Sequence, residues 1–144
     1  MPQKHWILVA NASHARVLER ASFTAPLVEL TDWLHPESRM PARDTERTPL
    51  GHSEAGRAGL APRSDLKHLH RSEFATTLAK YFHEAVLNHR DNALAFFVSN
   101  PLMGELLSHL DASVQHTLVA KHVLDLTSLS VTELDKRLRR EFRL

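Results

Sequence analysis

The chain has 144 residues, enough for one domain with a buried core. It has no cysteine, which excludes disulfides, thiol catalysis and cysteine-ligated metals. Its 18 basic and 17 acidic residues give a formal net charge of +1, so charge alone indicates no class of partner. No apolar run approaches the roughly 20 residues that span a bilayer, and the first residues do not resemble a signal peptide. We therefore expect a cytoplasmic protein with no membrane association.

The first third of the chain predicts three strands. Residues 6–10 are apolar and rich in β-branched side chains, which is typical of a strand buried on both faces. After turn residues at 11–14, residues 15–20 predict an antiparallel partner strand. Residues 27–34 predict a half-exposed edge strand, with Val28, Leu30 and Leu34 on one face.

Residues 35–64 show no periodicity and contain four prolines and three glycines. This composition predicts a long flexible loop inside a single domain spanning residues 1–144. Loops of this length are often functional, so we expect a binding role here. The alternative is a surface insertion that the fold tolerates.

The rest of the chain predicts three helices that alternate with two strands. Ser64 or Asp65 is expected to cap a long amphipathic helix that ends near residue 88. Residues 93–98 predict another strand buried on both faces. Ser99 or Asn100 is then expected to cap a helix that reaches about Leu110. Residues 118–124 predict the fifth strand, and residues 130–133 predict a capping box that opens the last helix.

The predicted order is β-β-β-α-β-α-β-α. Three hairpin-linked strands followed by right-handed crossovers place the first strand beside the fourth, which gives an α/β fold with a five-stranded mixed sheet ordered 3-2-1-4-5. This is the layout of ribonuclease-H-like domains and of the middle domain of class I release factors. Shared layout is an analogy and does not identify a function.

The chemistry of those two groups finds little support in the residues. A ribonuclease-H-type nuclease needs carboxylates at the ends of the first and fourth strands, where this chain has Asn11 and Asn100. The release-factor domain presents Gly-Gly-Gln before its long helix, where this chain has Gly56-Arg57-Ala58-Gly59-Leu60. The sequence therefore favours a domain without enzymatic activity. The alternative is a hydrolase or nuclease that uses Asn11, Asn100, Asp125 and nearby histidines in an unrecognised pattern.

The 11 histidines do not predict a metal centre. His68 and His70 are two residues apart, so on a helix they point to different sides, and no His-Glu-x-x-His pattern occurs. We expect no metal and no cofactor.

Two groups of basic residues are candidate phosphate-binding surfaces. The first leads from the loop into the start of the long helix, where backbone N–H groups also favour anions: Arg57, Arg63, Lys67 and Arg71, with Gly56 and Gly59 shaping the loop. The second lies on the last helix: Lys136, Arg137, Arg139, Arg140 and Arg143. Cations near a helix C-terminus also stabilise the helix, so an ordinary solvated surface explains the second group equally well.

Several local patterns, taken together and in order, resemble the bacterial host attachment proteins, also described as proteins required for attachment to host cells. They comprise residues 6–12, Ala15-Arg16, residues 35–39, residues 56–62, residues 64–67, Glu73-Phe74-Ala75, Asn100-Pro101 with Gly104 and Leu107, and residues 125–130. The family commonly has Asp where this chain has Asn11. The resemblance implies a release-factor-like fold, a connection with RNA or the ribosome, and an attachment phenotype.

We therefore expect a non-enzymatic binding domain that contacts RNA or the ribosome through residues 56–71, with Asn11 and Asn100 as further binding residues. The alternative is a protein-interaction module that supports attachment indirectly. An exposed edge strand at residues 27–34 would also allow pairing in a homodimer.

Overall fold

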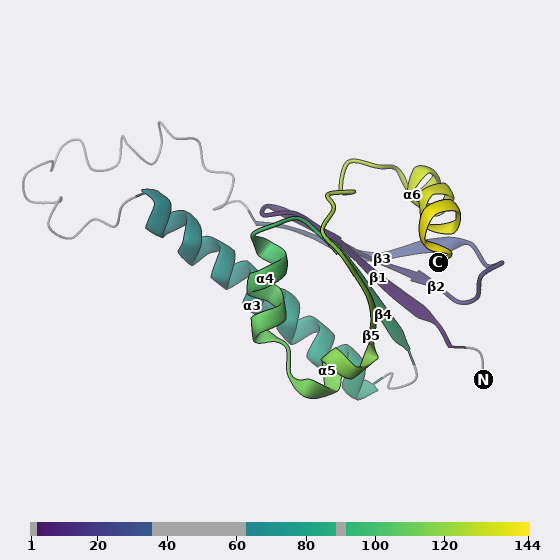
Figure 1. Cartoon of the computed structure of the whole chain (residues 1–144), viewed down its shortest axis with the longest axis horizontal. Coiled ribbons are helices and arrows are strands. Elements are labelled where there is room, and N and C mark those ends of the chain that lie inside the picture. The colour runs from purple at the N-terminus through teal and green to yellow at the C-terminus, as the bar shows by residue number, and fades with distance from the viewer. Residues whose placement is uncertain (1–2, 36–62, 89–91) are drawn as a thin grey trace, which may run out of the picture.

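The computed structural model describes residues 3–35, 63–88 and 92–144 (Figure 1). Its elements are the strands β1 (His5–Ala10), β2 (His14–Arg20), β3 (Leu27–Leu34), β4 (Ala93–Val98) and β5 (Leu118–His122), the helices α3 (Arg63–Asn88), α4 (Leu102–His109), α5 (Ala112–Thr117) and α6 (Val131–Arg137), and the π-helical turn η3 (Leu138–Phe142). The predicted loop at 35–64 falls largely outside the described residues.

The five strands form one mixed sheet ordered β3-β2-β1-β4-β5. β1 pairs antiparallel with β2 and parallel with β4, and β2 pairs antiparallel with β3. β5 completes the sheet parallel to β4. The predicted order and mixture of directions are confirmed. The two central strands, β1 and β4, contain the apolar runs at residues 6–10 and 93–98.

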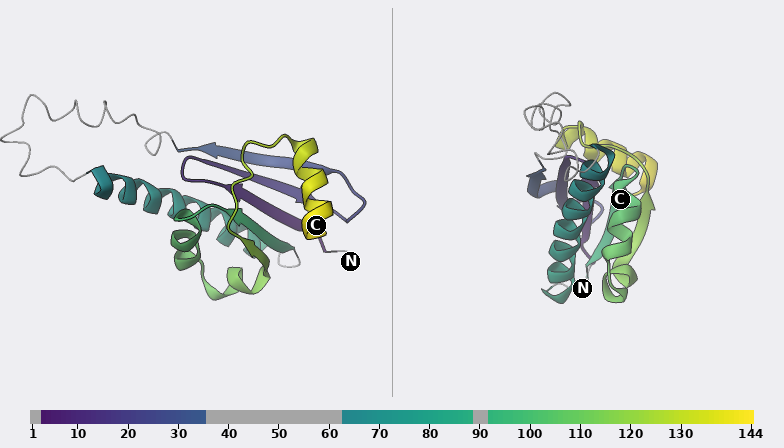
Figure 2. Two further views of the ribbon diagram at one scale, coloured as in Figure 1. Left: turned by 45° about the horizontal axis from the view of Figure 1, so that its top comes forward. Right: turned by 90° about the vertical axis from the view of Figure 1, so that its left-hand side faces the viewer.

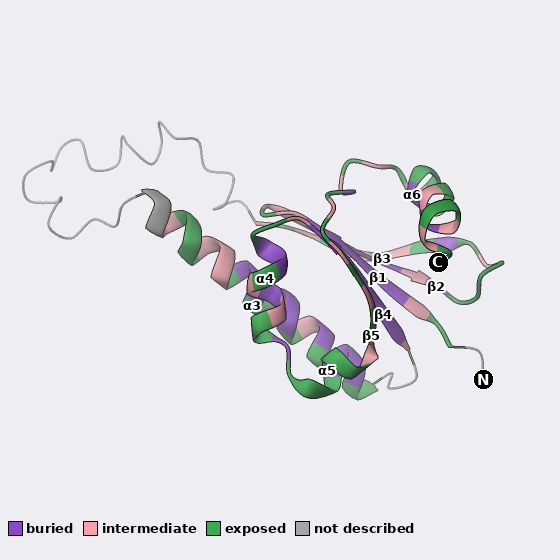
Figure 3. Cartoon of the chain, viewed as in Figure 1, coloured by how far each residue is buried: buried purple, intermediate pink, exposed green. Residues whose placement is uncertain are grey.

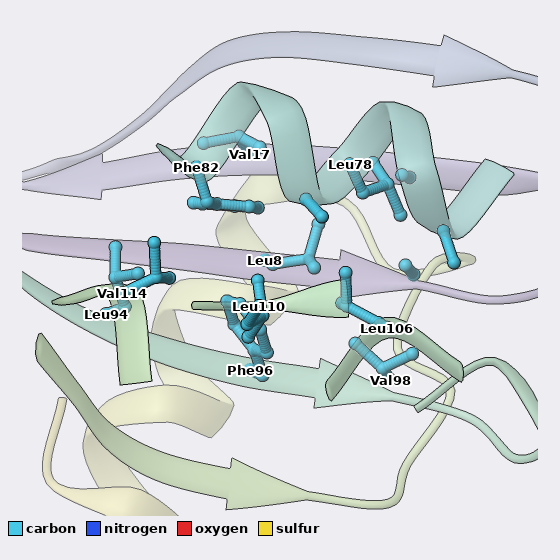
Figure 4. Close-up of a cluster of buried hydrophobic side chains, with 14 of the residues drawn as sticks. Leu8, Val17, Leu78, Phe82, Leu94, Phe96, Val98, Leu106, Leu110 and Val114 are labelled. Atoms are coloured by element: carbon cyan, nitrogen blue, oxygen red, sulfur yellow. The ribbon is translucent and has the colours of Figure 1, made fainter. Parts of the chain in front are cut away.

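Helices α3, α4 and α5 cover one face of the sheet (Figures 1 and 2). The core on this side takes alternate residues of the central strands, among them Leu8 and Phe96, and packs them against Leu78 and Phe82 of α3 (Figure 4). The ring centroids of Phe82 and Phe96 lie 5.2 Å apart. The outward side of α3 is exposed, as expected for an amphipathic helix (Figure 3).

Helix α6 and the turn η3 pack on the opposite face. This second core takes the intervening residues of β1 and β4, including Ile7 and Phe97, together with Leu134 and Leu138. Because both faces are covered, β4 is buried at every position and β1 at all but its first. This explains why these two strands read as continuous apolar runs.

The predicted helix starts are corrected at two places. Helix α3 begins at Arg63, so Ser64 and Asp65 lie inside its first turn and neither is the cap. Pro101 takes the cap position of α4 without a side-chain hydrogen bond, so neither Ser99 nor Asn100 caps it. The short helix α5 was not predicted, because six residues carry too little periodicity to distinguish it from a loop.

The prediction that Val28, Leu30 and Leu34 share one face of β3 is wrong. Thr31 lies opposite Val17 and Glu29 opposite Leu18, so Leu30 is the extra residue of a bulge. The bulge shifts the alternation by one residue, which puts Val28 and Leu34 on opposite faces of the sheet. All three side chains are exposed.

Candidate functional site

The turn that follows β1 is fastened to the segment that follows β5 through the Asn11 side chain. Its amide nitrogen donates to Asp125 (3.1 Å) and to the Thr127 hydroxyl (3.0 Å). Its carbonyl oxygen accepts from the backbone N–H groups of Ser13 and His14, each at 2.9 Å. Because these bonds occupy both ends of the amide, Asn11 acts as a structural link between two chain segments 114 residues apart.

Asp125 is held in its ionised form by the same network. Burial disfavours the charge, but hydrogen bonds from Thr127 and Asn11 and the proximity of His14 outweigh it, so the pKa of Asp125 lies below its ordinary value. The Thr127 hydroxyl and backbone N–H both donate to Asp125. The side chain beside Asp125 is the Asn11 amide, whereas a two-metal nuclease would need a second carboxylate at this position.

Arg16 reinforces this junction from the neighbouring strand. Its guanidinium donates to the backbone carbonyl groups of Thr127 and Leu129 and pairs with both carboxylate oxygens of Glu29 on β3. The side chain is almost fully buried. Since its donors are used inside the fold, Arg16 has a structural role.

The first basic group is only partly described. Gly56, Arg57 and Gly59 lie outside the described residues, and of Arg63 only its place as the first residue of α3 is described. Lys67 is exposed one turn further along α3.

Arg71 is engaged with neighbouring side chains and is only partly exposed. It lies 2.7 Å from the Nδ1 atom of His68, and its Nε lies 4.0 Å from the Glu105 carboxylate of α4. Asn100, at the end of β4, is exposed. The structure thus brings Asn11 and Asp125 together but joins neither to Lys67 or Arg71 by any hydrogen bond or ion pair within the described residues.

Two residues of the second basic group, Arg137 and Arg139, are engaged with other groups of the fold. Arg139 donates to the carbonyl groups of Phe23 and Ala25 in the β2–β3 turn, and its guanidinium lies 5.2 Å from the centroid of the Phe23 ring. Arg137 pairs with Glu141 at 2.7 Å. Lys136 and Arg140 are exposed, but Glu133 and Glu141 line the same depression. This surface is therefore mixed in sign.

One cluster of potential ligands was missed by the sequence analysis. His35 follows β3 directly and comes close to His70 and Glu73 on α3. The spacing of His70 and Glu73, three residues apart, was a readable signal because such residues share a helix face. His35 could not be added to them from spacing alone, because the tertiary fold makes that contact.

The β3 edge, defined here as β3 with its exposed side chains Val28, Leu30 and Leu34, is the other distinctive surface. These side chains are 50%, 41% and 60% exposed. Within the described part of the chain, β3 pairs with β2 on one side only. None of the described helices is long and apolar enough to cross a membrane.

The fold and these contacts define an α/β domain with a five-stranded mixed sheet, in which a polar network joins the segments that follow β1 and β5. The chain matches, over residues 6–138, the family model for proteins required for attachment to host cells. It belongs to this family, which confirms the resemblance seen in the sequence and indicates an attachment-related role. A comparison with curated proteins gave no significant match.

Proposed function

We propose that the protein is a protein-interaction module that supports attachment by receiving an extended strand of a partner protein along the β3 edge. The observation that carries this proposal is an eight-residue edge strand with three exposed large apolar side chains. A free strand edge offers backbone N–H and C=O groups that pair readily with another chain. The exposed side chains add apolar area on both faces of the strand.

The β3 edge lacks two common protections against such pairing. Proteins often place Lys or Pro in exposed edge strands, and β3 contains neither. It does contain two acids, but Glu29 is paired with Arg16, and Asp32 lies 3.6 Å from His14. The remaining obstacle is the bulge at Leu30, so the incoming strand would have to follow a locally twisted edge.

The opposite edge of the sheet is a weaker candidate. β5 has five residues and carries the exposed Lys121 near its centre. A charge in this position disfavours the approach of a second strand. Its exposed Val119 nevertheless makes β5 a suitable internal control, since this side chain is 58% accessible.

Photo-crosslinking in the native cell tests the proposal. A photoreactive residue is placed at Leu30 in one variant and at Val119 in another. We expect a defined protein adduct from position 30 and none from position 119. An adduct twice the mass of the chain would identify the partner as a second copy. Equal adducts from both positions, or none from position 30, would overturn the proposal.

A charge placed on the β3 edge should separate binding from folding. Val28→Lys and Leu34→Lys change exposed side chains, so each should alter the free energy of unfolding by less than about 0.5 kcal/mol. Both should reduce attachment and adduct formation, because a solvated cation opposes strand pairing. Val119→Lys, on the opposite edge of the sheet, serves as the matched control. Normal attachment by the folded double variant would contradict the proposal.

RNA or ribosome binding through the start of α3 is the second candidate. Arg63 opens the helix and Lys67 follows one turn later with an exposed side chain, which supports contact with phosphate. The sheet order also supports kinship with ribonuclease-H-like and release-factor domains. Binding of structured RNA should then weaken steeply as salt rises, and Arg63→Glu with Lys67→Glu should abolish it. Salt-insensitive or undetectable binding would remove this candidate.

A further inference from the structure

We propose that His35, His70 and Glu73 form a binding site for a single divalent transition-metal ion, with Zn²⁺ as the first ion to test. One potential ligand atom from each of the three side chains lies within 4.8 Å of the other two. The site begins at the residue that follows β3, but it uses different side chains from the β3-edge surface, and neither proposal depends on the other.

Helix α3 and the residue that follows β3 bring the three side chains together. His70 and Glu73 are three residues apart on α3, so they project from the same side of the helix. His35 follows the last residue of β3 and lies against this side of α3, where its ring stacks on Phe74 with centroids 4.9 Å apart. Two elements that are distant in the sequence thus supply three ligands.

His35 is held in place from two directions. Its backbone N–H donates to the carbonyl of Ser13 at 2.8 Å, which fixes the end of β3 against the β1–β2 turn. The ring of Phe74 beneath it is fully buried in the α3-side core. An imidazole anchored in this way loses little further conformational freedom when it binds an ion, which favours affinity.

The buried nitrogen of His70 is the second observation that indicates a ligand. Its Nδ1 atom is inaccessible to solvent and has no hydrogen-bond partner within the described residues. Leaving a buried polar atom without a partner is unfavourable, because the atom has lost its hydrogen bonds to water. Coordination to a metal ion would remove this cost, because neutral imidazole binds metals through a ring nitrogen.

The distances among the three potential ligand atoms are close to those found around a bound Zn²⁺ ion. Ligand bonds to Zn²⁺ are about 2.0–2.2 Å long, so ligand atoms around one ion lie within about 4.4 Å of one another. Glu73 is exposed, and a change of rotamer in its side chain can make up the small difference.

The donor set selects the class of ion. Two imidazoles and one carboxylate suit Zn²⁺ and related transition metals, whereas Mg²⁺ and Ca²⁺ prefer oxygen ligands only. Three protein ligands also leave a coordination position for water or a ligand group, as in open zinc sites. The neighbouring cation, Arg71, is directed toward Glu105 and His68, which limits its repulsion of the ion.

Metal titration of the full chain tests the site. The chain is stripped with a chelator and titrated with Zn²⁺ in competition with a chromogenic chelator. We expect one ion per chain, and we expect Glu73→Gln and His70→Ala each to weaken binding by at least about tenfold. His68→Ala is the matched control and should bind normally, because His68 is 62% exposed and faces Arg71 and Glu105.

Cobalt provides a second readout. Co²⁺ bound by nitrogen and oxygen ligands absorbs visible light, and this absorption should disappear in Glu73→Gln while circular dichroism shows an intact fold. Mg²⁺ at the same concentration should not displace Co²⁺. Several weak ions per chain, or binding that falls equally in His68→Ala and Glu73→Gln, would show adventitious histidine binding and overturn the proposal.

Discussion

At the scale of single residues, Asn11 shows what an amide can do at this turn that a carboxylate cannot. Its nitrogen donates to Asp125 while its oxygen accepts from two backbone N–H groups. A carboxylate has no donor at neutral pH and would place a second negative charge about 3 Å from Asp125. The amide therefore allows Asp125 to stay ionised in the junction.

The stability supplied by Asp125 should depend on pH. Because its pKa is lowered in the folded state, its contribution is complete well above the ordinary aspartate pKa of about 3.9 and is lost as the pH falls through the lower, folded value. Asp125 is exposed, so solvent weakens these interactions, and we expect Asp125→Ala to cost only about 0.5–1 kcal/mol at pH 7 and clearly less at pH 3. Urea unfolding of both proteins at pH 7, 5 and 3 measures this difference.

Ser128→Ala is the control: Ser128 lies in the same segment and is also exposed but carries no ionisable group, so it should show a small effect that is the same at each pH. A cost for Asp125→Ala that stays constant from pH 7 to pH 3 would contradict the assigned role of the ionised carboxylate.

At the scale of elements, α6 and η3 are fastened to the β2–β3 turn by a buried charge. Arg20 is 1% exposed, pairs with Asp135 of α6 and donates to the carbonyl of Ala25. Burial disfavours the ionised form of Asp135, but hydrogen bonds from Arg20 and Arg139 outweigh it and lower its pKa. The ion pair thus fixes the position of the C-terminal layer on the sheet.

Removing Asp135 should destabilise the fold strongly, because it leaves the Arg20 guanidinium buried without its counter-ion. We expect Asp135→Ala to cost about 3 kcal/mol in the free energy of unfolding. Glu141→Ala is the matched control, since its pair with Arg137 lies at the surface and such pairs contribute at most about 1 kcal/mol. Chemical denaturation that gave equal costs for the two variants would show that burial of Arg20 does not matter.

At the scale of the whole molecule, the central strands join two separate cores. Leu8 and Phe96 face α3, while Ile7 and Phe97 face α6. Parallel pairing of β1 with β4 keeps the two sets in register along the sheet. Loss of packing on one face should therefore weaken the support of the strands on the other face as well.

Phe96→Ala tests this arrangement. The side chain is fully buried beside Phe82, so its truncation should cost about 3–5 kcal/mol through lost transfer energy and the cavity left behind. Leu87→Ala, at a position that is 58% exposed, should cost less than about 1 kcal/mol. Amide hydrogen exchange should show that Phe96→Ala also lowers the protection of α6. Unchanged protection there would indicate that the two cores unfold independently.

The sequence by itself determined every described helix and strand except α5, because their signals are local. Apolar runs predicted β1 and β4. The helical periodicity of apolar residues predicted the buried side of α3. Ser130 and Glu133 predicted the capping box that opens α6. Element order combined with the handedness of crossovers then sufficed for the sheet order.

Only the tertiary structure decided which polar residues meet. The bulge in β3, the junction between Asn11 and Asp125, and the approach of His35 to His70 and Glu73 join residues that are far apart in sequence or depend on cross-strand register. Such contacts are set by how layers pack and how strands align, and no period in the chain encodes them. For the same reason the links that Arg139 and Asn11 make within the fold could not be read from their positions in the sequence.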